Sequence, residues 1–441
     1  MDRHHNVAEK LTAGPIAIIG GGYAGMAAGV ELAAAGIAVD IYEASRTLGG
    51  RARRADIDGI AVDNGQHILV GAYRETLRLM AQVGADPQAL LQRQSLHLDY
   101  PGVLCISAPD WPAPLHLAAA LVGAKGLTWG EKWAAIRFMQ YLKGCHFVLP
   151  ADITVTALMD SLRQPEKLCR YLWEPLCVAT LNTPPEQASA QVFANVLRDT
   201  LGADRAASDL LLPRVDLSAL FPEPAARYIE AHGGQVLRGQ RIGSLAQSGS
   251  HWRVDGIATE YSHVVLATAP HHLSPLLAGQ PGLESLQQKL AALRYEPIVT
   301  VYLQYPPSVT LNQAMAGYGD GLLQWLFDRG RLLGTPGLLA AVISAKGRHE
   351  DLNNEQLAAE LHREIATLVP NIPLPLWHKV ITEKRATFAC TPQLPRLATA
   401  TPLPGLLLAG DHIASDYPAT LESAVRSGIA AARQIIISAR R

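Results

Sequence analysis

The sequence predicts an α/β protein with more than one structural unit, and three observations lead to this prediction. Its 441 residues exceed the roughly 100–200 residues of an ordinary domain. A β-branched apolar run near the N-terminus precedes a glycine cluster and a stretch of small helix-forming residues, as in a parallel βαβ unit. A second apolar run near the C-terminus is also followed by a glycine and then by a helical pattern.

The composition excludes several classes of protein. Hydrophobic residues make up 49% of the chain and charged ones 17%, so we expect a large core and little disorder. A net charge of −1 and an aromatic content of 6% offer neither the charge nor the stacking surface for nucleic acid, which we exclude as a partner. Five scattered cysteines without a Cys-x-x-Cys pair predict no disulfide framework, no metal site and no dithiol relay.

Targeting and membrane-spanning segments are not predicted. Residues 1–14 carry charges and two histidines, without an apolar stretch followed by a cleavage signal. No run reaches the about 20 apolar residues that a spanning helix needs. We therefore expect a cytoplasmic chain that is either soluble or attached to the inner face of the cytoplasmic membrane.

The first βαβ unit is predicted from three segments. Residues 15–19 have the pattern of a buried parallel strand, residues 24–35 that of a helix of small residues, and residues 37–42 that of a second strand. The first strand ends at glycines and the second at an acid, which is the arrangement of a nucleotide-binding unit.

Three glycines between the first strand and the helix match the spacing Gly-x-Gly-x-x-Gly. Gly20 permits the tight turn, Gly22 lets the backbone approach a pyrophosphate, and Gly25 lets the helix pack closely on the sheet. The pyrophosphate then lies at the helix N-terminus. Glu43 follows about 20 residues later, where a carboxylate accepts the ribose hydroxyls. Together they predict a dinucleotide site.

A second glycine turn and a guanidinium follow this acid at Gly49, Gly50 and Arg51. A nicotinamide dinucleotide has no use for them, whereas the longer flavin dinucleotide extends past its pyrophosphate. This segment resembles the large FAD family that contains amine oxidases, phytoene desaturases and squalene-associated flavoproteins. The resemblance implies FAD as cofactor, with Gly50 and Arg51 at its phosphate and flavin regions.

Residues 55–62 alternate as in a hairpin strand and lead into Asp63 and His67. The family has an Asp-x-Gly segment here, and the resemblance implies that Asp63 lies close to the flavin. His67 fits two roles: a structural histidine with satisfied ring nitrogens, or a polar group that faces the substrate.

The sequence pattern changes in the middle of the chain. We expect helices from about residue 101 to 205, and residues 115–139 form an amphipathic, mildly basic stretch that fits either a domain helix or a membrane-surface helix. Residues 236–242 read as a strand, and the resemblance places Arg241 and Ile242 at a backbone contact with the adenine. Further elements are expected at residues 252–254, 261–267, 294–306 and 352–368, with a turn and no second nucleotide site at residues 317–321.

The C-terminal region predicts the other half of the cofactor site. Residues 406–409 form a buried strand that ends at Gly410 and Asp411, whose carboxylate suits ribityl hydroxyls. Thr420 is a natural N-cap and Leu421 a first-turn residue of a helix that reaches about residue 438. Such a helix N-terminus would stabilise negative charge on the flavin.

Motifs at both chain ends predict one discontinuous, Rossmann-like FAD-binding domain. Its segments are residues 14–100, 206–270 and 396–441. Residues 101–205 and 271–395 would form an interleaved α+β substrate-binding domain with a helical cap.

Residues 63–73, read with residues 410–427, resemble most the squalene-associated FAD-dependent desaturases, which act in bacterial hopanoid synthesis as hydroxysqualene dehydroxylases. The resemblance extends over nearly the whole chain, but only the FAD motifs are highly specific. It implies a hydrophobic triterpenoid substrate, hydroxysqualene, whose hydroxyl is removed with hydride from N5 of reduced flavin, giving squalene. His67, Tyr417 and Asp416 are the candidate proton donors for the leaving hydroxyl.

Other functions are weighed against this one. A carotenoid or phytoene-type desaturase, which passes hydride in the opposite direction, is the enzymatic alternative. Amine oxidases of the superfamily place a lysine near flavin N5, whereas this chain has none between Lys289 and Lys346. GDP-dissociation inhibitors share the fold without flavin chemistry, and the intact motifs argue against them. With one dinucleotide fingerprint in the chain, we expect an external electron donor or reductase.

Overall fold

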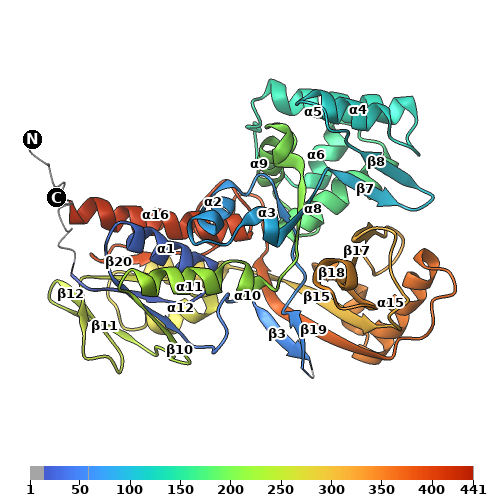
Figure 1. Ribbon diagram of the computed structural model, residues 1–441. Coiled ribbons are helices and arrows are strands. Elements are labelled where there is room, and N and C mark those ends of the chain that lie inside the picture. Colours follow the sequence, from blue (N-terminus) through green and yellow to red (C-terminus); the bar gives the residue numbers. More distant parts are fainter. Residues whose placement is uncertain (1–13, 58, 441) are drawn as a thin grey trace, which may run out of the picture.

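The computed structural model describes residues 14–57 and 59–440 (Figure 1). The expectation about residues 1–14 therefore lies almost entirely outside the described part. The predicted α/β class is confirmed: a parallel sheet with helices, an antiparallel second sheet with its own helix, and a helical cap above them. Among the described residues, no helix is both long and apolar enough to cross a bilayer.

The parallel sheet has the order β10-β2-β1-β14-β20. All of its neighbouring strands run parallel, so their carboxyl ends meet at one edge. The strands are β1 (Ile16–Ile19), β2 (Val39–Glu43), β10 (Gln235–Arg238), β14 (His263–Leu266) and β20 (Leu406–Leu408). They come from all three segments predicted for the cofactor domain, while the domain boundaries themselves stay a prediction.

Helices α1 (Tyr23–Ala34) and α16 (Leu421–Ala439) lie against each other above this sheet (Figure 1). Their approach is close because both carry small residues. A Cβ on Gly428 would lie 2.1 Å from the carbonyl oxygen of Ala24. The first and last helices are thus held together by a contact that admits no side chain at this position.

The second sheet has the order β16-β17-β18-β15-β19 and is antiparallel. Its strands are β15 (Tyr295–Gln304), β16 (Met315–Gly317), β17 (Trp325–Asp328), β18 (Leu338–Ser344) and β19 (Trp377–Phe388). Helix α15 (Asn354–Leu368) buries its apolar face in the same core as Val299 and Val301 of β15. Both β15 and α15 lie within the ranges that the sequence predicts.

The cap differs from the prediction at its start and in its first helix. It begins with a hairpin, β7 (His97–Tyr100) and β8 (Leu104–Ser107), where helix was expected from residue 101. The stretch 115–139 divides into α4 (Leu115–Val122) and α5 (Trp129–Gly144), because Thr128 starts a new helix with a capping box. The remaining cap helices are α6 (Val155–Ser161), α7 (Glu166–Leu168), a π-helix (Cys169–Trp173), α8 (Glu174–Leu181) and α9 (Ala190–Thr200).

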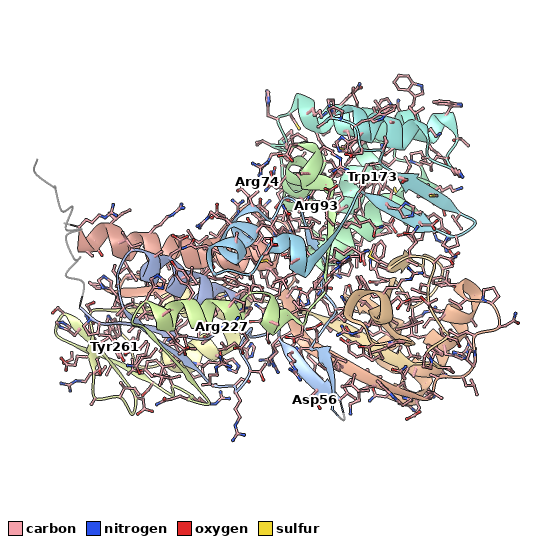
Figure 2. The ribbon with its side chains drawn as sticks, viewed as in Figure 1. Asp56, Arg74, Arg93, Trp173, Arg227 and Tyr261 are labelled. Atoms are coloured by element: carbon pink, nitrogen blue, oxygen red, sulfur yellow. The ribbon has the colours of Figure 1, made fainter. Side chains whose placement is uncertain are left out.

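The cap has a core of its own. Figure 2 shows Trp173 inside it, and this ring is 2% exposed and lies 4.7 Å from the ring of Phe138 in α5. Lys132 of α5 connects this helix to α4, since its Nζ donates to the carbonyl of Val122 at 2.6 Å. The cap is therefore a packed unit.

Smaller elements connect these layers. The predicted strand 236–242 ends early, at Arg238, and the predicted strand 261–267 divides between two sheets as β13 and β14. The other elements are β3 (Arg54–Ile57), β4 (Ile60–Asp63), β5 (Leu69–Val70), β6 (Leu91–Gln94), β9 (Leu210–Pro213), β11 (Leu245–Ser248), β12 (His251–Val254), β13 (Glu260–Tyr261), α2 (Arg74–Gln82), α3 (Pro87–Leu90), α10 (Leu217–Leu220), α11 (Pro222–Ala231), α12 (Pro270–Leu276), α13 (Glu284–Ala292), α14 (Arg329–Leu333), and two 3-10 turns (Arg205–Ser208, Arg348–Asp351).

Candidate active site

The glycine turn between β1 and α1 lies beside a helix N-terminus and is packed tightly at two of its glycines and less tightly at the third. Gly20 has φ +114°, and a Cβ there would lie 2.6 Å from the carbonyl oxygen of Ala267; a Cβ on Gly25 would lie 1.9 Å from that of Gly20. A Cβ on Gly22 would meet nothing closer than the Cα of Gly50, at 3.7 Å. No side chain caps α1, so its first N–H groups are open to an anion.

Glu43 holds this turn from the end of β2. One carboxylate oxygen accepts the N–H of Gly21 and the other that of Ser45, both at 2.7 Å. Each oxygen keeps a further lone pair. The predicted ribose contact of Glu43 stays a prediction, and the carboxylate lies where such a contact requires it, beside the glycine turn.

Arg51 and Asp411, predicted from opposite ends of the chain, form an ion pair. Their Nη2 and Oδ1 atoms are 2.6 Å apart, and Arg51 also donates to the carbonyl of Ala386 at 2.6 Å. Burial by itself would raise the pKa of Asp411, but the charge of Arg51 and the contact with His412 outweigh it and hold that pKa well below its usual range. The structure thus brings the two predicted halves of the site together.

The start of α16 agrees with the prediction. The Thr420 side chain accepts the N–H of Ser423 at 3.1 Å, and Leu421 is the first helical residue. Gly410 has φ +147°, and its N–H donates to Ser427 Oγ at 2.7 Å. The N-terminus of α16 therefore lies directly beside the turn that follows β20.

Glu422, in the first turn of α16, has a structural role that the sequence does not predict. Its carboxylate is fully buried and accepts the N–H groups of Glu75 and Thr76, the hydroxyl of Thr76 and Nε of Arg426. It thereby caps α2. An acid in a first helical turn is expected from the helix dipole alone, so only the tertiary structure identifies α2 as the partner.

Asp63 is placed in a buried network. Its carboxylate accepts the N–H of Leu217 at 2.8 Å and Nη1 of Arg329 at 3.2 Å. Its carbonyl accepts the hydroxyl of Tyr302 at 2.9 Å, and Arg329 donates also to Gln66 at 3.0 Å. Burial raises the pKa of Asp63, and Arg329 opposes this. The structure gives this carboxylate a structural role, while contact with the cofactor stays a prediction.

His67 follows the β3–β4 hairpin and lies beside the second sheet. Its Nδ1 is 2.8 Å from the carbonyl of Gly65, which can only accept, so Nδ1 carries the proton. The preceding residue, Gln66, donates its N–H to Thr300 of β15. Burial lowers the pKa of His67, Arg51 lowers it further, and the Gly65 bond and Asp63 oppose this. In the neutral ring Nε2 is an acceptor and can donate only after protonation.

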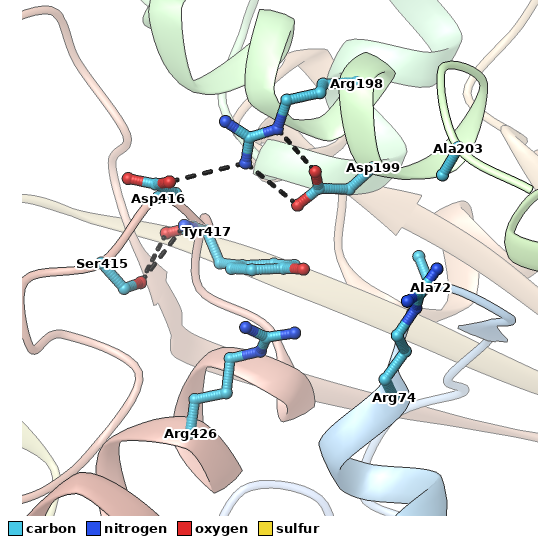
Figure 3. Close-up of a pocket in the computed structure, with 9 residues that line it drawn as sticks. All are labelled: Ala72, Arg74, Arg198, Asp199, Ala203, Ser415, Asp416, Tyr417 and Arg426. Carbon is cyan, nitrogen blue, oxygen red and sulfur yellow. Dashed lines mark hydrogen bonds and ion pairs between the residues drawn. The ribbon is translucent and has the colours of Figure 1, made fainter.

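Tyr417 and Asp416 line a different, polar cavity of about 450 Å³ between the cap and the C-terminal segment (Figure 3). The guanidinium of Arg426 lies 4.7 Å from the ring centre of Tyr417, and Asp416 pairs with Arg198 at 3.5 Å. Burial raises the pKa of Tyr417. The other lining residues are Ala72, Arg74, Asp199, Ala203 and Ser415. His67 does not line this cavity, so the structure separates the candidate proton donors.

Arg241 and Ile242 follow β10 as a loop. Ile242 is buried at 8% exposure and belongs to a core that also contains Leu245. Arg241 is exposed and lowers the pKa of His272, for which burial is the larger cause. The expected adenine contact of Ile242 stays a prediction.

Comparison with known proteins identifies related chains over nearly the full length. The model of the family "Flavin containing amine oxidoreductase" matches residues 23–436. The hydroxysqualene dehydroxylase of Rhodopseudomonas palustris is 32% identical and covers 96% of this chain and 98% of its own. The hydroxysqualene dehydroxylase of Sinorhizobium fredii is 29% identical, and the match covers 94% of this chain and 96% of that protein. The 15-cis-phytoene desaturase of Synechococcus elongatus is 25% identical, and the match covers 96% of this chain and 95% of that protein.

Solved structures share the fold at lower identity. A putative protoporphyrinogen oxidase from Exiguobacterium has a TM-score of 0.69 at 16% identity, covering 97% of this chain and 99% of its own. The cyclohexylamine oxidase of Brevibacterium oxydans has a TM-score of 0.68 at 19% identity, covering 97% and 100%. These similarities support the fold and carry no information about substrate.

Replacing Glu43 by Ala should weaken FAD retention, because the glycine turn loses its anchor and the ribose hydroxyls lose a charged acceptor. A charge-assisted hydrogen bond contributes about 1.5–3 kcal/mol, which is about ten- to a hundredfold in affinity. Fluorescence of FAD released on dilution measures the change. Glu223→Ala, which removes a surface ion pair with Arg238, is the control and should retain FAD normally. Unchanged affinity in Glu43→Ala would exclude the ribose role.

Proposed function

The chain belongs to the flavin-containing amine oxidoreductase family and is an FAD-dependent oxidoreductase, and on this premise we propose that it converts hydroxysqualene to squalene by reductive dehydroxylation. The observation that carries this proposal is the 32% identity to a hydroxysqualene dehydroxylase over almost the whole of both chains. The desaturase alternative is supported by a relative of lower identity, 25%.

The residues present fit FAD. The uncapped N-terminus of α1 and Gly22, where a Cβ would meet nothing within 3.7 Å, suit a pyrophosphate, and Glu43 lies beside them. Arg51 and Asp411 lie where the two glycine turns and β20 meet. FAD supplies the redox chemistry when bound, a hydride for the carbon that loses its hydroxyl. The protein has to bind the hydrocarbon, exclude water and deliver one proton to the leaving oxygen.

We propose His67 Nε2 as the source of that proton. The ring is oriented by its bond to Gly65 and lies near Arg51 and β15, at the junction of the two sheets. Strand β15 contains no lysine, so no amine oxidase-type lysine competes for this place. Tyr417 is the second candidate, since its phenol stays protonated. Asp416 is the weakest, because its exposed carboxylate is an acceptor for Arg198.

The direction of hydride transfer separates the two enzymatic proposals. Photoreduced protein mixed with hydroxysqualene without oxygen should be reoxidised, and squalene should form in a one-to-one ratio with flavin. This requires an external reductant or reductase in the cell, since the sequence shows one dinucleotide fingerprint. If hydroxysqualene leaves the flavin reduced and a saturated polyisoprenoid reduces the oxidised form, the desaturase proposal replaces this one.

The same rapid-mixing experiment tests His67. The reoxidation rate should fall as the pH rises through the pKa of His67, which lies below its ordinary value of about 6.5, because only the imidazolium can donate from Nε2. In His67→Gln the rate should drop about 10²–10⁴-fold and lose this pH dependence, at unchanged FAD content. A loss below about tenfold would exclude His67, and a large loss in Tyr417→Phe would then assign the donor to Tyr417.

We also propose that the cap binds a membrane surface through α4, α5 and their flanking loops. Trp129 and Trp133 are 66% and 60% exposed. Figure 1 shows α4 and α5 on the outer side of the cap, away from the parallel sheet. Between residues 111 and 148 the sequence has four lysines and arginines and one acid. Three of these basic side chains are exposed, since only Lys132 is buried, and they complement anionic lipid. Other exposed apolar side chains on this surface are Trp111, Leu115, Val122, Tyr141 and Val148.

Flotation with anionic liposomes tests this surface. The protein should float, and the double variant Trp129→Gln/Trp133→Gln should stay in the soluble fraction, because two interfacial aromatics are lost. The matched control is Leu374→Gln/Leu376→Gln, which removes two exposed apolar side chains outside the cap and should float normally. Wild-type protein that never floats, or a Trp variant that floats as well as the control, contradicts the proposal.

A further inference from the structure

Basic side chains gather beside the glycine turn without being part of the predicted motifs. The segment after β14 lies against this turn, since a Cβ on Gly20 would lie 2.6 Å from the carbonyl oxygen of Ala267 and 3.3 Å from the nitrogen of Thr268. His271 and His272 follow within the same segment. Sequence reasoning assigned them to the start of the other domain.

Side chains from three further elements approach the two histidines. The rings of His271 and His272 are 4.1 Å apart, and His271 meets the ring of Tyr295 edge-on at 6.2 Å. The guanidinium carbon of Arg385, on β19, lies 5.8 Å from the centre of that same ring. Arg241, after β10, acts electrostatically on His272. The cluster therefore combines α12, β15, β19 and the β10 loop.

The negative charge that would balance this cluster is missing from the described part of the chain. Arg241 and Arg385 form no ion pair there. The nearby carboxylates are engaged elsewhere: Glu43 with two backbone N–H groups, Glu383 with Asn64 and Asp411 with Arg51.

Two polar atoms of the segment are also buried without a hydrogen-bond partner among the described residues. They are Thr268 Oγ1 and His271 Nδ1. Buried polar atoms are rarely left unsatisfied in a native protein, so such atoms point to a group that binds there.

We infer that His271 and His272, with Arg241 and Arg385, form a second anion cluster that binds the diphosphate of FAD, and that the histidines take up protons when FAD binds. The glycine turn and the N-terminus of α1 supply backbone N–H groups for the same diphosphate, and the cluster adds side-chain charge beside them. The inference rests on FAD binding and not on the proposed substrate, so failure of hydroxysqualene as a substrate leaves it intact.

The sign of the proton linkage follows from the surroundings of the rings. Burial, His272, Arg385 and Arg51 lower the pKa of His271 to about 4, and only Glu383 opposes them. Burial, Arg241 and Arg385 lower the pKa of His272, with Glu43 opposing. A bound diphosphate raises both pKa values, so protons are taken up between the free and bound values. FAD affinity should therefore rise as the pH falls through that interval.

Release of FAD from the diluted holoenzyme, followed by flavin fluorescence between about pH 5.5 and 8.5, tests the linkage. In the wild type the apparent Kd should increase with pH, by at most about tenfold per pH unit for each proton taken up. In His271→Ala/His272→Ala the Kd at the acid end should be raised and its pH dependence flattened. His251→Ala changes an exposed histidine of β12 and should behave as wild type.

Arg385→Gln keeps the inference testable if the double histidine variant does not fold. It removes one exposed charge and should weaken FAD binding about tenfold. Added salt should change the Kd of this variant less than that of the wild type. Calorimetry of FAD rebinding in buffers of different ionisation enthalpy should show net proton uptake in the wild type. Proton release, a pH-independent Kd in the wild type, or an unchanged Kd in Arg385→Gln would overturn the inference.

Discussion

The contact of α16 with α1 is the constraint on which the cofactor site depends. Gly428 lies so close to the Ala24 carbonyl that a single Cβ there would overlap with it, and cores tolerate such overpacking poorly. This approach places β20 beside β14 and brings the turn after β20 to the glycine turn after β1. Arg51 and Asp411 can pair only because the two ends of the chain meet in this way.

Two buried carboxylates hold the rest of the structure around that contact. Glu422 caps α2 from the first turn of α16. Asp63 joins the β3–β4 hairpin to α10 and, through Arg329, to α14, which directly follows β17 of the second sheet. A buried charge left without its partner is strongly destabilising. These two acids therefore fix the relative positions of the elements that surround the cofactor, although they lie within motifs that suggest direct contact with it.

Charge is distributed differently over the regions of the molecule. The polar cavity beside Tyr417 is lined by arginines whose charges are met by acids, as for Arg198 with Asp199 and Asp416. The cluster at His271 has basic groups without such compensation. The outer face of the cap combines exposed aromatics with lysines. We therefore propose a different contact for each region: internal ion pairs, a bound anion, and a lipid surface.

The sequence by itself determined the α/β class, the glycine turn, the N-cap at Thr420 and the positions of β15 and α15. These features depend on local rules, namely which residues permit a positive φ, cap a helix or alternate along a strand. The tertiary structure decided what the charged side chains contact. Asp63 meets Arg329, Glu422 meets α2 and His271 lies near Arg385, in each case from distant segments of the chain. A carboxylate or an imidazole carries no local signal of its partner, because that partner is set only when the chain ends and both sheets have packed together.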